Sequence, residues 1–171
     1  MTATWSVLSK NTLFAQNKCM ISVFNASGSG VVLRLYRAWM LNNQLTAVTG
    51  VLTNVEIRKL SSMSGGTTLT PAPRDTSSTA LPAQVTAATN ASVTPTDLYR
   101  RVIWSTDEPA ANATVTMDEF ELIPSLNCIW VMGYRTTMVE PIVLREGQGF
   151  GIINTGAVVG QADLYFEFTV T

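Results

Sequence analysis

The last part of the chain, residues 141–171, constrains the fold most because it is typical of one strand after another. From Asp163 to Val170, bulky apolar side chains at every second position alternate with Tyr165, Glu167 and Thr169. This period of two is the signature of a strand with one buried face. A chain that ends in this way is expected to close an antiparallel sheet.

A glycine-rich turn precedes that strand. Residues 142–144 lead into Gly147, Gly149 and Gly151, which permit the positive φ angles of a tight turn or bulge. Residues 150–153 then return as a strand. The whole stretch therefore predicts two consecutive β units and assigns the chain to the all-β class.

Upstream segments show the same alternation. The segments are residues 18–25, 31–40, 50–60, 98–105, 114–123 and 127–134. The first two are expected to pair across the Gly-Ser loop 26–30, and segment 50–60 is expected to have a neighbour on both sides. About eight or nine strands without an amphipathic helix predict one domain, an antiparallel two-sheet jelly-roll-like β-sandwich. An Ig-like sandwich is the alternative.

Two segments are candidate extended arms. Residues 61–95 carry four prolines, a Gly65-Gly66 pair and many Ser, Thr and Ala, with few bulky side chains for a core. A loop of that length is either functional or mobile, and we expect it to lie along a neighbouring subunit, with a surface excursion as the alternative. Residues 1–14 are the second arm candidate, with Trp5 as an apolar anchor, or else the first strand.

The candidate interface residues come from these segments and from one arginine pair. They are Trp5, Leu8, Phe14, Leu69, Pro71, Pro73, Arg74, Leu81, Pro82, Arg100 and Arg101. Strand alternation sends Arg100 and Arg101 to opposite faces. We expect at least one of them to form a salt bridge at a subunit contact, with Asp107, Glu108 or Glu121.

The charge and composition of the chain limit the kinds of partner it is expected to bind. The chain has 11 basic and 12 acidic residues, a net charge of −1, and only 13% charged residues against the roughly 25% of an average soluble domain. Nucleic-acid affinity depends on clustered Lys and Arg, so nucleic acid is not an expected partner. A weakly charged surface rich in Thr suits contact with other proteins, and a homo-oligomer is expected.

The absence of histidine excludes the usual catalytic centres. No histidine occurs in the sequence, so neither the metal site of a cupin-type enzyme nor an ordinary Ser-His-Asp or Cys-His arrangement is possible. Paired acids could act on a glycosidic bond or bind calcium. The candidates are Asp107, Glu108, Asp118, Glu119, Glu121, Glu140 and Glu146. Their positions in turns and on one solvent-facing strand side favour structural roles, so we expect no catalytic residue, cofactor or metal.

Cysteines and tryptophans are expected to be structural. Cys19 and Cys128 lie in apolar strand-like segments and are expected to be buried free thiols, with a disulfide as the alternative. Trp39 and Trp130 are assigned to the core. A sugar- or receptor-binding platform would have to come from the other aromatic candidates, which are Tyr36, Tyr99, Trp104 and Tyr134.

Several segments resemble structural proteins of tailed-phage virions, of the small jelly-roll or β-sandwich type that decorates or cements the head. They are residues 50–58, 61–70, 101–109 and 141–170. The resemblance implies a trimer on the outer capsid surface that bridges neighbouring capsomers, with the major capsid protein as partner and no catalytic residues.

The N-terminal sequence and the apolar stretches bear on where the chain is made. The sequence begins without the charged and apolar regions of a signal peptide and has no membrane-spanning apolar stretch, so synthesis in the host cytoplasm is expected, with no membrane partner. The alternatives are a tail, baseplate or head-fibre component that binds a receptor or glycan, and a carboxylate hydrolase of cell-wall or capsule glycans.

Overall fold

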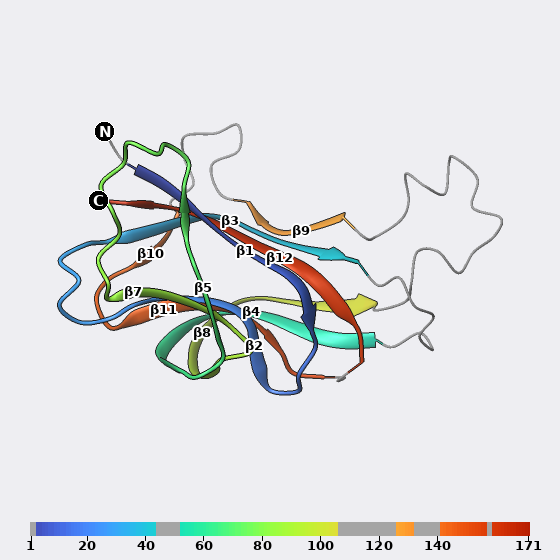
Figure 1. The fold of residues 1–171 in the computed structure, drawn as a ribbon. Coiled ribbons are helices and arrows are strands. Elements are labelled where there is room, and N and C mark those ends of the chain that lie inside the picture. The colour runs from blue at the N-terminus through green and yellow to red at the C-terminus, as the bar shows by residue number, and fades with distance from the viewer. Residues whose placement is uncertain (1–2, 44–51, 106–125, 132–140, 157–158) are drawn as a thin grey trace.

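The computed structural model describes residues 3–43, 52–105, 126–131, 141–156 and 159–171, and the described regular structure is entirely β. Two antiparallel sheets lie one above the other (Figure 1). Sheet A contains β1 (Ala3–Leu13), β3 (Leu33–Asn42), β6 (Ala72–Pro73), β9 (Leu126–Val131), β10 (Ile142–Leu144) and β12 (Gln161–Val170). Sheet B contains β2 (Lys18–Asn25), β4 (Leu52–Ser64), β5 (Thr67–Leu69), β7 (Val85–Thr89), β8 (Ser92–Ser105) and β11 (Gln148–Asn154).

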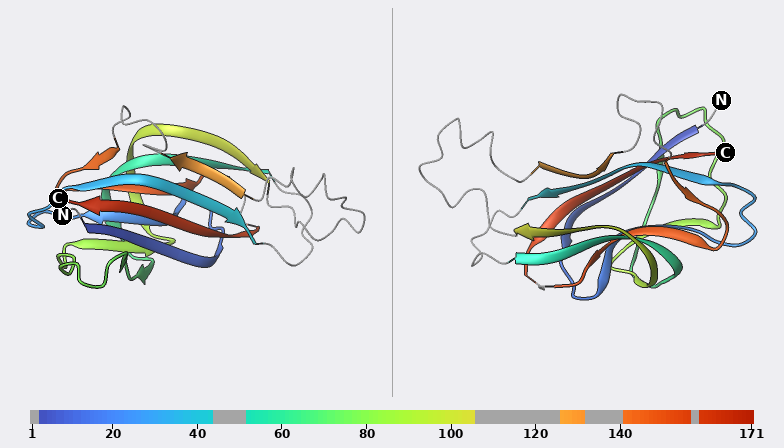
Figure 2. Two further views of the ribbon diagram at one scale, coloured as in Figure 1. Left: turned by 90° about the horizontal axis from the view of Figure 1, so that it is seen from above. Right: turned by 180° about the vertical axis from the view of Figure 1, so that it is seen from behind.

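Strands from the N-terminal part of the chain pair with strands from the C-terminal part in a nested order. β1 pairs with β12, β2 with β11, β3 with β9 and β10, and β4 with β8. This nesting of first with last is the connectivity of a jelly roll, and it places the pairs alternately in sheet A and sheet B (Figure 2). The predicted jelly-roll-like sandwich is therefore confirmed, and the Ig-like alternative does not describe the connectivity. The described residues form twelve strands instead of the expected eight or nine, and the expected strand 114–123 lies outside them.

The core fills the space between the sheets. Leu164, Phe166 and Phe168 of β12 are fully buried, as the alternation of this strand predicts. Phe166 meets Phe150 of β11 edge-on, with ring centroids 5.3 Å apart. This is a preferred geometry for aromatic pairs, and here it joins the last strand of sheet A to the centre of sheet B.

One expected pairing is wrong. β2 and β3 do not pair with each other but lie in different sheets, and β10 and β11, which flank the predicted turn, also lie in different sheets. The predicted turn exists: Gln148 donates its backbone N–H to the carbonyl of Arg145, and Gly147 has a φ of 76°. Alternation indicates which side chains are buried, but in a sandwich a short connection can equally carry the chain to the opposite sheet. Segment 50–60, in contrast, has a neighbour on both sides as predicted, because β4 lies between β11 and β8.

The arm assignment of residues 61–95 is also wrong. β6 pairs with β1 in sheet A, while β5 and β7 extend sheet B beside β2. Val85 and Ala87 belong to the core, with 6% and 1% of their surfaces exposed. β7 lies near the edge of sheet B, with only the three-residue β5 beyond it. Residues 3–13 form β1, so the first-strand alternative holds for the second arm candidate.

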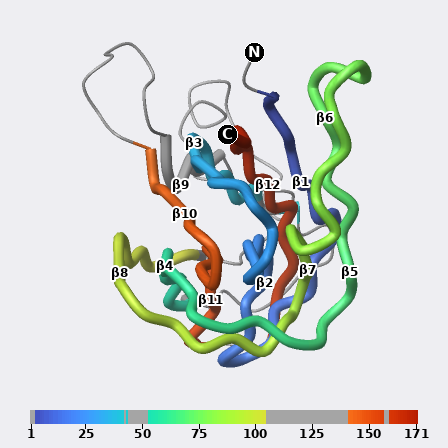
Figure 3. Tube along the Cα trace, turned by 90° about the vertical axis from the view of Figure 1, so that its left-hand side faces the viewer, coloured from blue at the N-terminus to red at the C-terminus, as the bar shows by residue number. Residues whose placement is uncertain are grey.

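A second, smaller apolar layer covers the outer face of sheet B. It consists of Cys19, Leu60 and Ile153, with Phe24 and Val93 packed against them. The end of β4 and the start of β8 run together across this side of the sandwich (Figure 3). Gly149 and Gly151 make room for the layer: a Cβ on Gly151 would collide with Cys19 Sγ, and one on Gly149 would lie 2.5 Å from the Phe24 ring. These two glycines serve close packing, and of the three predicted turn glycines only Gly147 has a positive φ.

Candidate interaction surfaces

The outer face of sheet A carries an aromatic row that crosses three strands. Tyr165 of β12 lies directly opposite Leu8 of β1 on one side and Trp39 of β3 on the other. Leu8 is 47% exposed, and Tyr165 and Trp39 are partly exposed. We call Leu8, Tyr165 and Trp39 the aromatic row. The row places three large, mainly apolar side chains on the outside of the sandwich. Trp39 and Tyr165 each also have one polar atom, the indole nitrogen and the hydroxyl oxygen.

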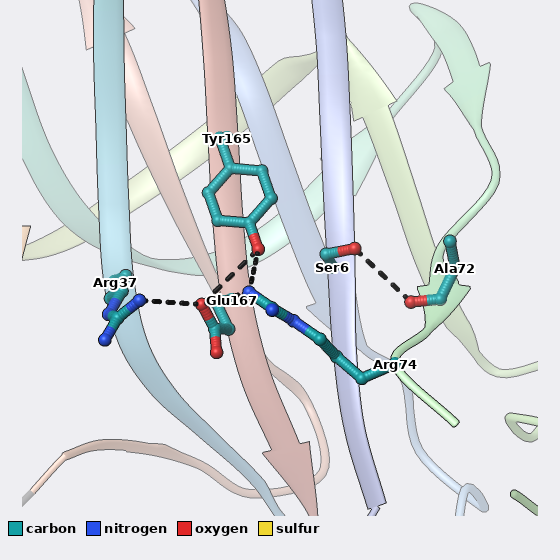
Figure 4. A network of polar contacts seen from close by, with 6 residues as sticks. All are labelled: Ser6, Arg37, Ala72, Arg74, Tyr165 and Glu167. Atoms are coloured by element: carbon teal, nitrogen blue, oxygen red, sulfur yellow. Dashed lines mark hydrogen bonds and ion pairs between the residues drawn. The ribbon is translucent and has the colours of Figure 1, made fainter.

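A charged row lies beside the aromatic row, one pleat further along the strands. Glu167 is opposite Ser6 on one side and Arg37 on the other. Its Oε2 atom lies 3.5 Å from Arg37 Nη1 and 2.9 Å from Arg74 Nη2, and it accepts a 3.3 Å hydrogen bond from Tyr165 (Figure 4). Arg74 reaches this point from beyond β6 and also donates to Tyr165 Oη at 3.0 Å. These contacts with Tyr165 and Glu167 raise the pKa of Arg74 above its usual range.

Two buried polar atoms on β3 and β12 have no hydrogen-bond partner within the described residues. They are the indole nitrogen of Trp39 and the hydroxyl oxygen of Thr169. Buried polar atoms in folded proteins are nearly always paired. An additional polar group beside Trp39 would satisfy its N–H.

A groove of about 610 Å³ opens at the end of the sandwich where β1 begins and β12 ends. Residues 74–82 form one wall, and Trp5, Val31 and Val170 contribute to the apolar lining. The volume lies within the range of small-molecule sites. Arg74 points to Glu167, and Asp75 accepts hydrogen bonds from the backbone and side chain of Ser77, so both charged side chains of the lining have partners in the chain itself.

The predicted interface residues fall into different environments. Trp5 and Phe14 are buried in the core of their own chain, with 6% and 4% exposed, so they are not anchors on a neighbour. Leu69 and Leu81 pack partly buried against the core, Pro71, Pro73 and Pro82 are partly buried, and Leu8 and Arg74 are the two that reach the outer face of sheet A.

The arginine pair lies on β8 at the edge of sheet B. Arg101 is opposite Glu56 and Arg100 is opposite Ile57, which places them on opposite faces as predicted. Arg101 Nε lies 3.8 Å from Glu56 Oε1, so its acidic neighbour belongs to the same chain. Of the expected acidic partners, Asp107, Glu108 and Glu121 lie outside the described residues.

The aromatic platform candidates do not gather at one place. Trp104 is only 2% exposed and belongs to the core. Tyr36 lies on β3 in sheet A and Tyr99 on β8 in sheet B, while Tyr134 lies outside the described residues. Trp39, assigned to the core, in fact faces outwards, and the side chain of Trp130 lies outside the described part of the chain.

Sequence reasoning missed Trp39 because β3 contains an irregularity. β12 residues Glu167 and Phe168 face Arg37 and Leu35, so Tyr36 is an extra residue in β3. Leu33 and Leu35 are buried before this point, and Ala38 and Met40 after it. In the sequence, the apolar positions change from odd numbers (Leu33, Leu35) to even numbers (Ala38, Met40), and this change could have indicated the extra residue.

The remaining chemical candidates have structural surroundings. Glu146 accepts hydrogen bonds from the backbone N–H groups of Gly28 and Gly30, at 3.1 and 2.8 Å, and these bonds lower the pKa of its carboxyl group. Cys19 is a buried free thiol, as predicted. No cluster of three metal-binding side chains occurs in the described part of the chain, and the other acidic candidates, from Asp107 to Glu140, lie outside it. Nor do the described residues form a helix that could span a membrane.

The chain matches no family model, no curated protein and no solved structure. Its function is therefore proposed from its own fold and surfaces.

Proposed function

We propose that this chain is a non-enzymatic structural subunit of a virion, which forms a homotrimer and decorates or cements the outer surface of a tailed-phage capsid. Its partners are then further copies of itself and the major capsid protein. The observation that carries the proposal is the aromatic row of Leu8, Tyr165 and Trp39 on the outer face of sheet A.

The composition of this face supports a protein partner. Trp, Tyr and Arg are the residue types most enriched where single side chains dominate binding between proteins. Trp39, Tyr165, Arg37 and Arg74 gather here from three separate parts of the sequence, with Leu8 beside them. The charged groups are already paired within the chain, so covering the face would not leave Glu167 as an isolated buried charge.

The pairing of residues 61–95 within their own chain alters the proposed way in which such a subunit binds. Residues 61–95 pair with the two sheets of their own chain, so the proposal no longer relies on this segment as a free clamp. The resemblance of residues 50–58 and 141–170 to head-decorating proteins involves strands β4 and β10 to β12. Binding through the faces of a rigid sandwich follows, and it needs little ordering of the subunit on assembly.

The test is co-sedimentation of the purified chain with empty shells of the major capsid protein encoded in the same genome. The expected result is that the chain pellets with the shells and saturates at a fixed ratio to capsid subunits. A panel of host-surface glycans is assayed in parallel. A chain that ignores the shells and binds a glycan would overturn the proposal in favour of a tail, baseplate or fibre component.

A further inference from the structure

The edge of sheet B is formed by the longest of the described strands. β8 has 14 residues, and within the described chain it is the last strand of its sheet, beyond β4. An edge strand offers backbone groups that can pair with another extended chain, and proteins usually shorten, bend or cover such edges. β8 is long, so its two halves have to be considered separately.

The first half of β8 is blunted. Its pairing with β4 changes register three times between Ile57 and Ser62 of β4. Pro95 also lies in this part of β8. Bulges and proline are both devices that prevent addition of another strand. Val93 of this half packs with Leu60 of β4 against the apolar layer that contains Cys19, and the two strands curve together here (Figure 3).

The second half is regular. From Arg100 to Ser105 it pairs with Ile57 to Leu52 without a shift. Ile103 is 71% exposed, the highest value among the described large apolar residues, and Leu98 and Tyr99 nearby are 48% and 37% exposed. Val102 and Trp104, on the opposite side of the strand, pack against the core.

We propose that this half of β8 pairs with the same strand of a second copy, antiparallel and with Ile103 at the two-fold axis. Ile103 then lies opposite its own copy, Val102 faces Trp104 and Arg101 faces Ser105. The inner layer continues from one sandwich to the next, and the most exposed apolar side chain becomes covered.

The charge pattern excludes the registers centred on the arginines, and the high exposure of Ile103 favours an axis at this residue. A two-fold axis at Arg100, at Arg101 or between them would place arginines directly opposite each other, which destabilises a strand pair. With the axis at Ile103 no like charges face each other, and each Arg101 keeps Glu56 of its own chain. This contact goes beyond the proposed function, because it lies on sheet B rather than on the aromatic row. It would link neighbouring oligomers by a closed two-fold contact.

Cysteine cross-linking tests the register. In Ile103→Cys the two thiols sit on the axis, at the spacing of directly opposed residues, which a disulfide can bridge. Leu13→Cys is the control of matched exposure, since Leu13 is 65% exposed on a different strand. Arg101→Cys is the register control, because its copy lies four residues along the partner strand, about 13 Å away and out of disulfide reach. The wild-type chain gives the background from its own cysteines.

Under mild oxidation, Ile103→Cys is expected to form a covalent dimer at least about tenfold faster than either control, since the pairing holds the thiols at a high effective concentration. Equal rates in Ile103→Cys and Leu13→Cys would overturn the proposal, and faster linkage of Arg101→Cys would overturn the register.

A second measurement does not depend on oxidation. Sedimentation equilibrium at rising concentration is expected to show growth of the wild-type mass beyond its basic oligomer. Ile103→Lys should abolish that growth, and Leu13→Lys should retain it. Growth that persists in Ile103→Lys contradicts the pairing. Loss of the trimer alone does not affect the cross-linking test, because any two copies can form the strand pair.

Discussion

Tyr165 of β12 lies directly opposite Trp39 of β3 on the outer face of sheet A, and Leu8 of β1 lies opposite Tyr165 from the other side. The buried indole N–H of Trp39 has no partner among the described residues. Contiguous apolar groups on the outside of a soluble domain usually mark a contact with another molecule. The row therefore lies at the centre of the proposed assembly.

Leu8→Lys should dissociate the trimer. The substitution places a charge in the middle of the proposed contact, where desolvation without a partner is unfavourable. Leu8 is 47% exposed, so the isolated fold should tolerate lysine. The check is the mass of the variant by light scattering. Leu13→Lys, also on β1 but at the end of the strand, is the matched control and should remain oligomeric. Dissociation of both variants, or of neither, would argue against the row as the contact.

Gly151→Ala should lower the free energy of unfolding by about 1–3 kcal/mol, the usual cost of overpacking. A Cβ at this position would collide with Cys19 Sγ and lie 3.2 Å from Leu60 Cδ1. Urea unfolding measures the change. In a Cys19→Ala background the same substitution should cost clearly less, because the sulfur is gone. An equal cost in both backgrounds would show that the sulfur is not the obstacle.

Cys19 should resist thiol reagents in the folded protein. Burial raises the pKa of this thiol to about 12, so almost no thiolate is present at neutral pH. Peptide mass spectrometry after alkylation is expected to find Cys19 unmodified in buffer and modified in denaturant. Rapid labelling of Cys19 under native conditions would mean that the covering ends of β4 and β8 open readily.

Glu146→Gln should destabilise the protein at neutral pH but not in acid. Backbone hydrogen bonds from Gly30 and Gly28 lower the pKa of Glu146 in the folded state. A lowered pKa contributes stability above the ordinary carboxyl pKa of about 4.3, and this contribution is lost as the pH falls through the folded value. The two proteins should therefore differ in stability at pH 7, and the difference should disappear as the pH falls through the lowered folded pKa of Glu146. A difference that does not change with pH would exclude the charge as its cause.

The sequence was sufficient for the class of fold because a regular alternation has few physical explanations. In β12 the buried residues Leu164, Phe166 and Phe168 are those that alternation selects, and β2 spans residues 18–25 as predicted. The number of strands and the lack of helical periodicity then favoured a sandwich. Partner choice was not accessible in this way, since the hairpin expected between β2 and β3 would bury the same faces as the observed crossing between sheets.

The surfaces were harder to predict than the core. One extra residue at Tyr36 reverses the phase of β3 and turns Trp39 outwards. The segment 61–95 was mistaken for an arm because a core was expected to need bulky side chains, whereas Val85 and Ala87 of β7 belong to the core. Leu8 and Arg74 were identified as interface candidates, but their proximity to Tyr165 depends on pairings between β1, β6 and β12 that local patterns do not encode.

The most direct test of the central claim is the mass of the wild-type chain in solution, measured by light scattering over a range of concentrations. The account predicts a particle of three chains, each of 18.5 kDa, that persists on dilution into the micromolar range typical of specific complexes. A particle with the mass of a single chain at every concentration would contradict it.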